Sequence, residues 1–447
     1  MGSHMRAYTR SPSRVGRRSA ARDTVNVAYL STYPPRECGL ANFCEDLVQS
    51  SLLQGSAGEP TVIAMENDSH YRDYRWPVAL IVSETREDHY EAAAQHLNQS
   101  PVDVVSVQHE FGIFGGYEAR GLCRFLDRLV KPVVSTLHTV VPDPEPHMRA
   151  GLREVAERSQ RLVVMNGLAI DILAAHYGID RRKVSLVHHG APAPSPQDRE
   201  EMKARLGLVG RRVLSTFGLV GRGKGLEYAL AALPDIRARH PDVCYIIAGQ
   251  THPGVQRVEK ESYREELKSL VDRLGIQDSV RFVNRYLSRS EIAYYLAATD
   301  VYITPYLNRH QVASGTLAYA VAAGRAVIST PFLYARFLLD DARDVLVDFR
   351  SEEAIAAAAN RILDNPDLQR TLELRNRVYG EQMLWPAVGA QYLRLFRSLI
   401  RDHRAAMPAA TYSQLQFSFP TQIEREASHE ADRGRPSSIA PPLAAAD

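Results

Sequence analysis

The apolar residues of the chain follow two alternating patterns. Short runs that are apolar almost throughout, such as VNVAYLST (25–32) and VYITPY (301–306), predict strands buried on both faces. Between such runs lie longer stretches with apolar residues three and four apart, such as 41–53 and 352–365, which predict helices. Buried strands that alternate with helices are typical of a parallel sheet with both faces covered. The sequence therefore predicts an α/β protein.

The pattern of strands and helices occurs twice, separated by the proline-rich stretch 192–200. The predicted strands are 25–32, 61–65, 78–82, 103–110, 132–140, 161–166 and 184–190 before this stretch, and 212–220, 243–250, 280–286, 301–306, 326–330 and 344–349 after it. A chain of 447 residues is expected to form more than one domain. We predict two Rossmann-like domains, 25–195 and 205–384, with parallel sheets that face each other across an interdomain cleft.

The two ends of the chain differ from this pattern. A helical stretch, 368–400, contains Trp385-Pro386, and proline should kink or restart the helix there. Residues 385–404 are expected to cross back to the first domain. The initial MGSHM looks like a tag remnant, and the rest of 1–24, like 405–447, has the composition of a disordered tail. The basic N-terminal tail can touch anionic lipid, but a solvated tail is the expected state.

Composition narrows the class of protein. A net charge of +2 gives no general reason to expect nucleic acid as a partner. The sequence has no apolar run long enough to span a bilayer and no signal peptide. Its four cysteines show no spacing typical of a metal site or a disulfide framework. We therefore expect a cytoplasmic protein, whose oligomeric state the sequence leaves open.

The stretch 301–331 carries the first candidate site. It predicts a buried strand, a polar loop, a short helix that starts at Ser314-Gly315-Thr316 and stops at Gly324, and a second buried strand. The free amides at such a helix start point beyond the carboxyl end of the strand, where they favour an anion. We expect this anion to be the diphosphate of a nucleotide-sugar, although many strand–turn–helix units bind no ligand.

Three more residues stand where predicted strands end. Gly39 follows the first strand and either allows a ligand to approach the backbone or only serves a turn. Lys224 lies in the turn GRGKG (221–225), where it binds phosphate or is simply exposed. His138 ends a buried strand and could hydrogen-bond a sugar hydroxyl or be purely structural.

Taken in chain order, Gly39, His138, Lys224 and the stretch 301–331 resemble a glycosyltransferase of the two-domain GT-B type, and specifically of family 4. VSLVHHGAP (184–192) adds to the resemblance, since it is similar to the interdomain motif of that family. The resemblance implies a metal-independent hexosyltransferase of polysaccharide biosynthesis, without a cofactor. The enzyme would transfer mannose or glucose from a nucleoside-diphosphate sugar to a carbohydrate-like acceptor, with retention at the anomeric carbon. No pair of carboxylates stands at a strand end where a metal would bridge a diphosphate.

The resemblance also implies roles for individual residues. Lys224 and the amides of Ser314, Gly315 and Thr316 would stabilise the diphosphate, and His138 would approach the donor sugar. The nucleotide base is expected near Asn284, Arg285 and Tyr286, which could stack on it or hydrogen-bond its edge. Further implied contacts are Gly39 on the donor, Arg222 on a phosphate in place of a missing arginine, and His109 and Glu110 in an acceptor pocket.

Two positions depart from the pattern of the family. Members usually carry two glutamates separated by seven residues, the first near the donor sugar and the second on the ribose. Here Gln311 and Tyr319 occupy those positions. Glutamine can exchange hydrogen bonds with a sugar but has no charge, and tyrosine cannot accept from two ribose hydroxyls as a carboxylate does.

Because Gln311 and Tyr319 replace the two glutamates, other activities are also compatible with the same two-domain fold. A sugar-phosphate phosphorylase or a nucleotide-sugar epimerase would not need the two glutamates. A non-catalytic sugar-binding scaffold is the third alternative, against which the presence of Lys224 and His138 argues.

Overall fold

The structure is a computed structural model that describes residues 24–55, 57–67 and 72–406. The described residues up to Ile400 belong to one compact unit, and Arg401–Ala406 belong to a second. Both sheets and the cleft described below lie in the first unit. The predicted terminal tails lie almost entirely outside the described residues.

The first sheet consists of parallel strands in the order β3-β2-β1-β4-β5-β6-β7. The strands are β1 (Val27–Ser31), β2 (Thr61–Glu66), β3 (Val78–Ser83), β4 (Val104–His109), β5 (Val133–Leu137), β6 (Arg161–Val164) and β7 (Val184–Leu186). The helices are α1 (Gly39–Leu53), α2 (Glu87–Asn98), α3 (Arg120–Arg128), α4 (Pro146–Arg158) and α5 (Gly167–Tyr177), with the 3-10 turn η1 (Arg181–Lys183). The strand order reverses between β1 and β4.

The second sheet is also parallel and has the order β10-β9-β8-β11-β12. The strands are β8 (Arg212–Phe217), β9 (Val243–Ala248), β10 (Val280–Val283), β11 (Val301–Thr304) and β12 (Ala326–Ser329). The helices are α6 (Arg199–Arg205), α7 (Leu226–Ala231), α8 (Leu233–Arg239), α9 (Pro253–Glu259), α10 (Ser262–Leu274), α11 (Arg289–Ala298), α12 (Gly315–Ala322), α13 (Leu333–Leu338), α14 (Glu352–Asp364) and α15 (Pro366–Gly380). The 3-10 turns are η2 (Arg222–Lys224), η3 (Gln277–Ser279), η4 (Asp340–Val345) and η5 (Glu381–Met383). Here the order reverses between β8 and β11.

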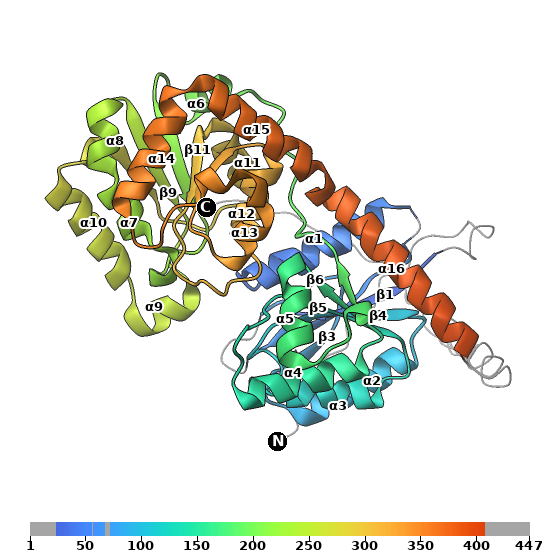
Figure 1. Cartoon of the computed structure of the whole chain (residues 1–447). Coiled ribbons are helices and arrows are strands. Elements are labelled where there is room, and N and C mark those ends of the chain that lie inside the picture. The colour runs from blue at the N-terminus through green and yellow to red at the C-terminus, as the bar shows by residue number, and fades with distance from the viewer. Residues whose placement is uncertain (1–23, 56, 68–71, 407–447) are drawn as a thin grey trace, which may run out of the picture. The chain divides into compact units, whose positions relative to one another are not determined.

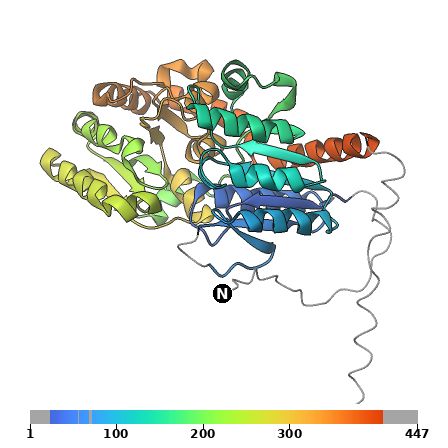
Figure 2. The same cartoon turned by 90° about the horizontal axis from the view of Figure 1, so that it is seen from below.

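Helices pack on both faces of each sheet (Figure 1; Figure 2). In the first sheet α3 packs against α2 and α4, and in the second α7 packs against α10 and α14. Most strands between these layers are buried almost throughout, as their continuous apolar sequences predict, whereas the edge strands β3, β7 and β10 are partly exposed. The prediction of two parallel-sheet α/β domains is confirmed, whereas the limits 25–195 and 205–384 stay predictions.

The last helix, α16 (Trp385–Ala406), begins one residue before Pro386. Its Tyr392 hydroxyl lies 3.0 Å from the Thr136 hydroxyl of β5, so the helix packs against the first sheet. Just before this helix, Leu384 forms a bridge with Ala191. The chain passes from the first sheet to the second near Ala191 and returns near Leu384, so these two connecting segments are hydrogen-bonded to each other. The predicted restart at the proline and the return to the first domain are confirmed.

One predicted strand is wrong. Residues 340–345 form the 3-10 turn η4, and the segment 344–349 makes only an isolated bridge between Leu346 and Ser329. The apolar run between Asp344 and Asp348 has only three residues, and the 3-10 turn η4 extends into it, so no further strand forms. The predicted strand 184–190 also ends early, at Leu186, which leaves His189 in the loop beyond the strand.

Candidate active site

A cleft of about 710 Å³ lies beyond the carboxyl ends of the strands. Its lining comes from the loops after β1, β4, β5 and β7 on one side and from the loops after β8, β9, β10 and β11 on the other. We call these sides the first-sheet wall and the second-sheet wall. Both walls include the positions where the strand order reverses, which is where open α/β sheets bind ligands.

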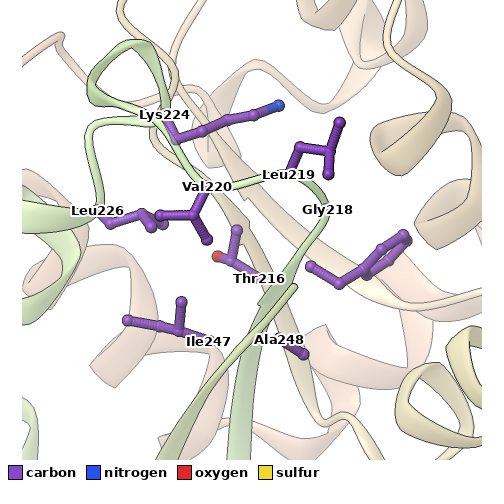
Figure 3. A pocket seen from close by; sticks show the side chains of 9 residues that line it. Thr216, Gly218, Leu219, Val220, Lys224, Leu226, Ile247 and Ala248 are labelled. Carbon is purple, nitrogen blue, oxygen red and sulfur yellow. The ribbon is translucent and has the colours of Figure 1, made fainter. Parts of the chain in front are cut away.

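Lys224 is held on the second-sheet wall by a tightly packed turn. Gly225 has φ +61°, and a Cβ there would lie 2.1 Å from the Pro305 carbonyl oxygen. The ammonium Nζ lies 3.8 Å from the centre of the Tyr306 ring. Within the described residues no carboxylate pairs with Lys224, so its charge is available to a ligand. Figure 3 shows its side chain extending toward Leu219, in the loop after β8.

The start of α12 lies on the same wall. Ser314 caps the helix by accepting a hydrogen bond from the Leu317 amide, as its position in the sequence predicts. The amides of Gly315 and Thr316 have no hydrogen-bond partner among the described residues. The Thr316 hydroxyl lies 2.6 Å from the hydroxyl of Tyr306, the same ring that lies under Lys224. The lysine and the helix start are therefore positioned together, as an anion site requires.

The two residues that replace the glutamates of the family both line the cleft. Gln311 donates from Nε2 to the Ala313 carbonyl at 2.8 Å, which leaves its own Oε1 for a ligand. The Tyr319 ring stacks on Phe217 with 6.3 Å between the ring centres. Burial raises the pKa of Tyr319, so its hydroxyl stays protonated.

His138 stands on the first-sheet wall in the neutral form. Burial lowers its pKa to about 3. Its Nε2 lies 3.0 Å from Oε1 of Gln108, whose amide nitrogen donates in turn to Ser106. Because a carbonyl oxygen can only accept, Nε2 carries the proton and Nδ1 is a bare acceptor.

His189 is a residue to which the sequence interpretation gave no role. Its Nδ1 donates to the Gly190 carbonyl at 2.7 Å, which makes Nε2 the bare acceptor, and burial lowers its pKa to about 4. A Cβ at Gly315 would lie 3.2 Å from this Nε2, so the imidazole packs against the start of α12. The histidine pair in VSLVHHG could have indicated a site residue. However, the sequence does not show that β7 ends early, and this early end places His189 at the cleft.

Glu110 lines the cleft immediately after β4. Its Oε1 accepts from the Phe111 amide and its Oε2 from the Thr139 hydroxyl, both at 2.9 Å. Burial raises the pKa of Glu110, and these two hydrogen bonds offset part of the rise. Gly39 also lines the cleft, and a Cβ there would meet nothing within 4 Å. The fold itself therefore does not require a glycine at position 39.

Side chains at the start of α1 connect the two walls. The Asn42 amide donates to the Tyr286 hydroxyl, and Arg289 pairs with Glu45 and Asp46. Burial raises the pKa of Asp46 to about 6, and Arg289 offsets only part of this rise. The sequence carried no signal for these contacts, because their partners lie more than 240 residues apart.

Four predicted site residues do not line the cleft, which corrects their expected positions. Arg222 turns away, because Glu259 and Glu266 hold its guanidinium at the surface. Asn284 and Arg285 are exposed, and Arg285 pairs with Glu291. His109 is buried between aromatic rings behind the loop after β4. The other predicted residues, Gly39, Glu110, His138, Lys224, Tyr286, Gln311, Ser314, Gly315, Thr316 and Tyr319, line it. Their roles stay predictions.

Two further observations concern the described part of the chain. It contains no group of three His, Cys, Asp or Glu side chains able to hold a metal ion. None of its helices is long and apolar enough to cross a membrane.

Comparison with known proteins identifies the class. Residues 59–193 match the family "Glycosyltransferase Family 4", and residues 211–365 match "Glycosyl transferases group 1". Together the two matches cover more than half of the chain and include strands of both sheets. The chain therefore belongs to the GT-B glycosyltransferases of the family 4 type.

The chain is similar to several characterised members. A D-inositol 3-phosphate glycosyltransferase of Streptomyces scabiei is 26% identical over 297 residues, which cover 61% of this chain and 64% of the relative. The match thus spans less than two thirds of that relative. The alpha-monoglucosyldiacylglycerol synthase of Streptococcus pneumoniae is 22% identical over 370 residues, which cover 76% of this chain and 78% of the relative.

Solved structures share the fold. Anabaena Alr3699/HepE in complex with UDP and glucose superimposes with a TM-score of 0.65 and 15% identity, covering 84% of this chain and all of that chain. Sucrose-phosphate synthase from Thermosynechococcus elongatus gives a TM-score of 0.68 with 17% identity, covering 85% of this chain and all of that chain.

Proposed function

We propose that the protein transfers a hexose, glucose or mannose, from a nucleoside-diphosphate sugar to a hydroxyl of a carbohydrate-like acceptor. The observation that carries the proposal is the shared position of Lys224 and the free α12 amides at the reversal between β8 and β11. A diphosphate there would meet one full positive charge and the positive end of a helix. The bare Nδ1 of His138 on the facing wall suits a sugar hydroxyl.

The transfer is proposed to retain the configuration of the anomeric carbon. The bond from that carbon to the diphosphate oxygen breaks, and the acceptor oxygen forms its bond on the same face. The acceptor proton moves to the departing phosphate oxygen. Lys224 and the α12 amides stabilise the charge that grows on the diphosphate, so the proposal includes no metal ion.

The structural neighbours suggest which donor to test first. The HepE structures hold UDP or UDP-glucose, and the streptococcal relative is named for a glucosyl product. UDP-glucose is therefore the first donor to test, followed by GDP-mannose and the ADP and TDP sugars.

The test combines each donor with a panel of sugar acceptors and follows release of the nucleoside diphosphate. Release that depends on both substrates, with an α-linked product from an α-linked donor by NMR, is the expected result. A β-linked product contradicts retention. A sugar altered without release of nucleoside diphosphate indicates an epimerase instead. Failure of every nucleoside diphosphate to bind contradicts the proposal as a whole.

A further inference from the structure

The first-sheet wall differs sharply from the second in charge. Glu110 is the one carboxylate among the described residues that line the cleft, and it belongs to the first-sheet wall. Among the described residues, no lysine or arginine lines this wall. The lysine of the lining, Lys224, follows β8 of the second sheet, and each wall also contributes two histidines.

The polar atoms around Glu110 are hydrogen-bond acceptors. Each carboxylate oxygen of Glu110 takes one hydrogen bond from the protein and can accept another. The Thr139 hydroxyl gives its hydrogen to Glu110, so only its lone pairs remain for a ligand. His138 likewise offers a bare nitrogen, since its proton is engaged with Gln108. A ligand at this place must therefore supply hydrogen-bond donors.

The same wall also has donors at the start of α1, whose Phe43 packs against His138. They are the amides of Gly39 and Leu40 and the side-chain amide of Asn42, which already donates to Tyr286. Arg149 of α4 is exposed at the first turn of that helix and is not part of the lining. Among the described residues, the side chains that hydrogen-bond with Glu110 and its neighbour His138 thus offer acceptors to a ligand, and no lysine or arginine on this wall would bind an anion.

We propose that the acceptor unit bound beside Glu110 is an uncharged polyhydroxyl compound, such as a sugar ring, and that a phosphorylated unit is excluded. Hydroxyl groups donate to Glu110 and Thr139, whereas phosphate oxygens only accept and are repelled by the carboxylate. This proposal rests on the proposed function and names its acceptor class. It also separates the chain from relatives named for D-inositol 3-phosphate.

The experiment compares matched acceptors with the donor that the enzyme uses. The pairs are myo-inositol with D-inositol 3-phosphate and glucose with glucose 6-phosphate. The wild-type enzyme should favour the neutral member of a pair by at least about tenfold in kcat/KM. E110Q should reduce this preference about tenfold, because the repelling charge is gone and one amide hydrogen becomes available. E118Q makes the same change at an exposed carboxylate outside the cleft and should keep the wild-type preference.

A binding measurement separates this proposal from the proposed function. Ligand-observed NMR on protein saturated with nucleoside diphosphate should show binding of the neutral sugar and none, or weaker binding, of its phosphate. Glucose 6-phosphate that binds or reacts as well as glucose in the wild-type protein overturns the acceptor class, with or without turnover. An E110Q preference equal to the wild-type value overturns the role of Glu110. Loss of nucleotide binding, by contrast, contradicts the proposed function alone.

Discussion

The two walls of the cleft differ in charge and in the side chains that they present to a ligand. The second-sheet wall presents a lysine without a carboxylate partner and the free amides of a helix start. Besides the amides at the start of α1, the first-sheet wall presents the half-buried carboxylate of Glu110 and two histidines that burial keeps neutral, with bare nitrogens. One wall thus suits a diphosphate, and the other suits hydroxyl groups. Two sheets of similar topology can therefore bind chemically different halves of a reaction, through the loops at their carboxyl edges.

Removing the positive charge of Lys224 from the second-sheet wall should have the largest effect on activity. In K224A, we expect kcat/KM to fall about a hundredfold, the size typical for loss of one group that stabilises charge in the transition state. The matched control is R222A in the same turn, whose side chain points away to Glu259 and Glu266. R222A should stay within about twofold of wild type in a nucleotide-release assay. Equal losses in the two variants contradict the distinction between these two basic residues.

Acidification should lower the stability of the protein, because the first-sheet wall contains histidines that are neutral in the folded state. Because the pKa of His138 is about 3 in the folded protein, the unfolded chain binds a proton first as pH falls below about 6.5. Stability is therefore fully present above that pH and decreases on acidification, by about 1.4 kcal/mol per pH unit from this one residue.

Urea unfolding at pH 7, 6 and 5 measures this dependence. H138Q removes the titrating group, so its unfolding free energy should fall less steeply than that of the wild type. The same pH dependence in both proteins contradicts a buried, neutral His138.

Adding a methyl group at Gly315, where the two walls meet, should have an intermediate effect on nucleotide binding. In G315A the new Cβ would lie 3.1 Å from Cε1 of His189, so the imidazole and the α12 start must move apart slightly. We expect about tenfold weaker binding of nucleoside diphosphate, measured by calorimetry, because displaced amides donate poorly. The double variant G315A/H189A relieves the contact and should recover part of the loss. Additive losses contradict direct contact between the walls.

Removal of one link between the walls should have the smallest effect. Y286F deletes the hydroxyl that accepts from Asn42 and should lower the free energy of unfolding by about 1 kcal/mol. Y294F makes the same change at an exposed tyrosine of α11 and serves as the control. A melting temperature equal in both variants indicates that the link contributes nothing to stability.

The sequence predicted the fold because its signals are local. Continuous apolar strands, the Ser314 cap and the stop at Gly324 each act within a few residues, and the structure has them at the predicted places. The segment 344–349 was mistaken for a strand, because a run of three apolar residues does not show whether the chain pairs with a neighbouring strand or closes into a turn.

The site was less predictable, because it depends on where side chains point. Arg222 and Lys224 look equivalent in GRGKG. The difference arises because Glu259 on α9 and Glu266 on α10 bind the Arg222 side chain outside the cleft. His189 was missed, because its place at the cleft follows from the early end of β7.

The central claim is that the second-sheet wall binds the diphosphate, and thermal unfolding with UDP, GDP, ADP and TDP tests it most directly. At about a hundred times its dissociation constant, one of these ligands should stabilise the wild-type protein by about 2.7 kcal/mol. The same ligand should stabilise R222A equally and K224A far less. Equal stabilisation of K224A, or no stabilisation of the wild type by any of the four, would contradict the account.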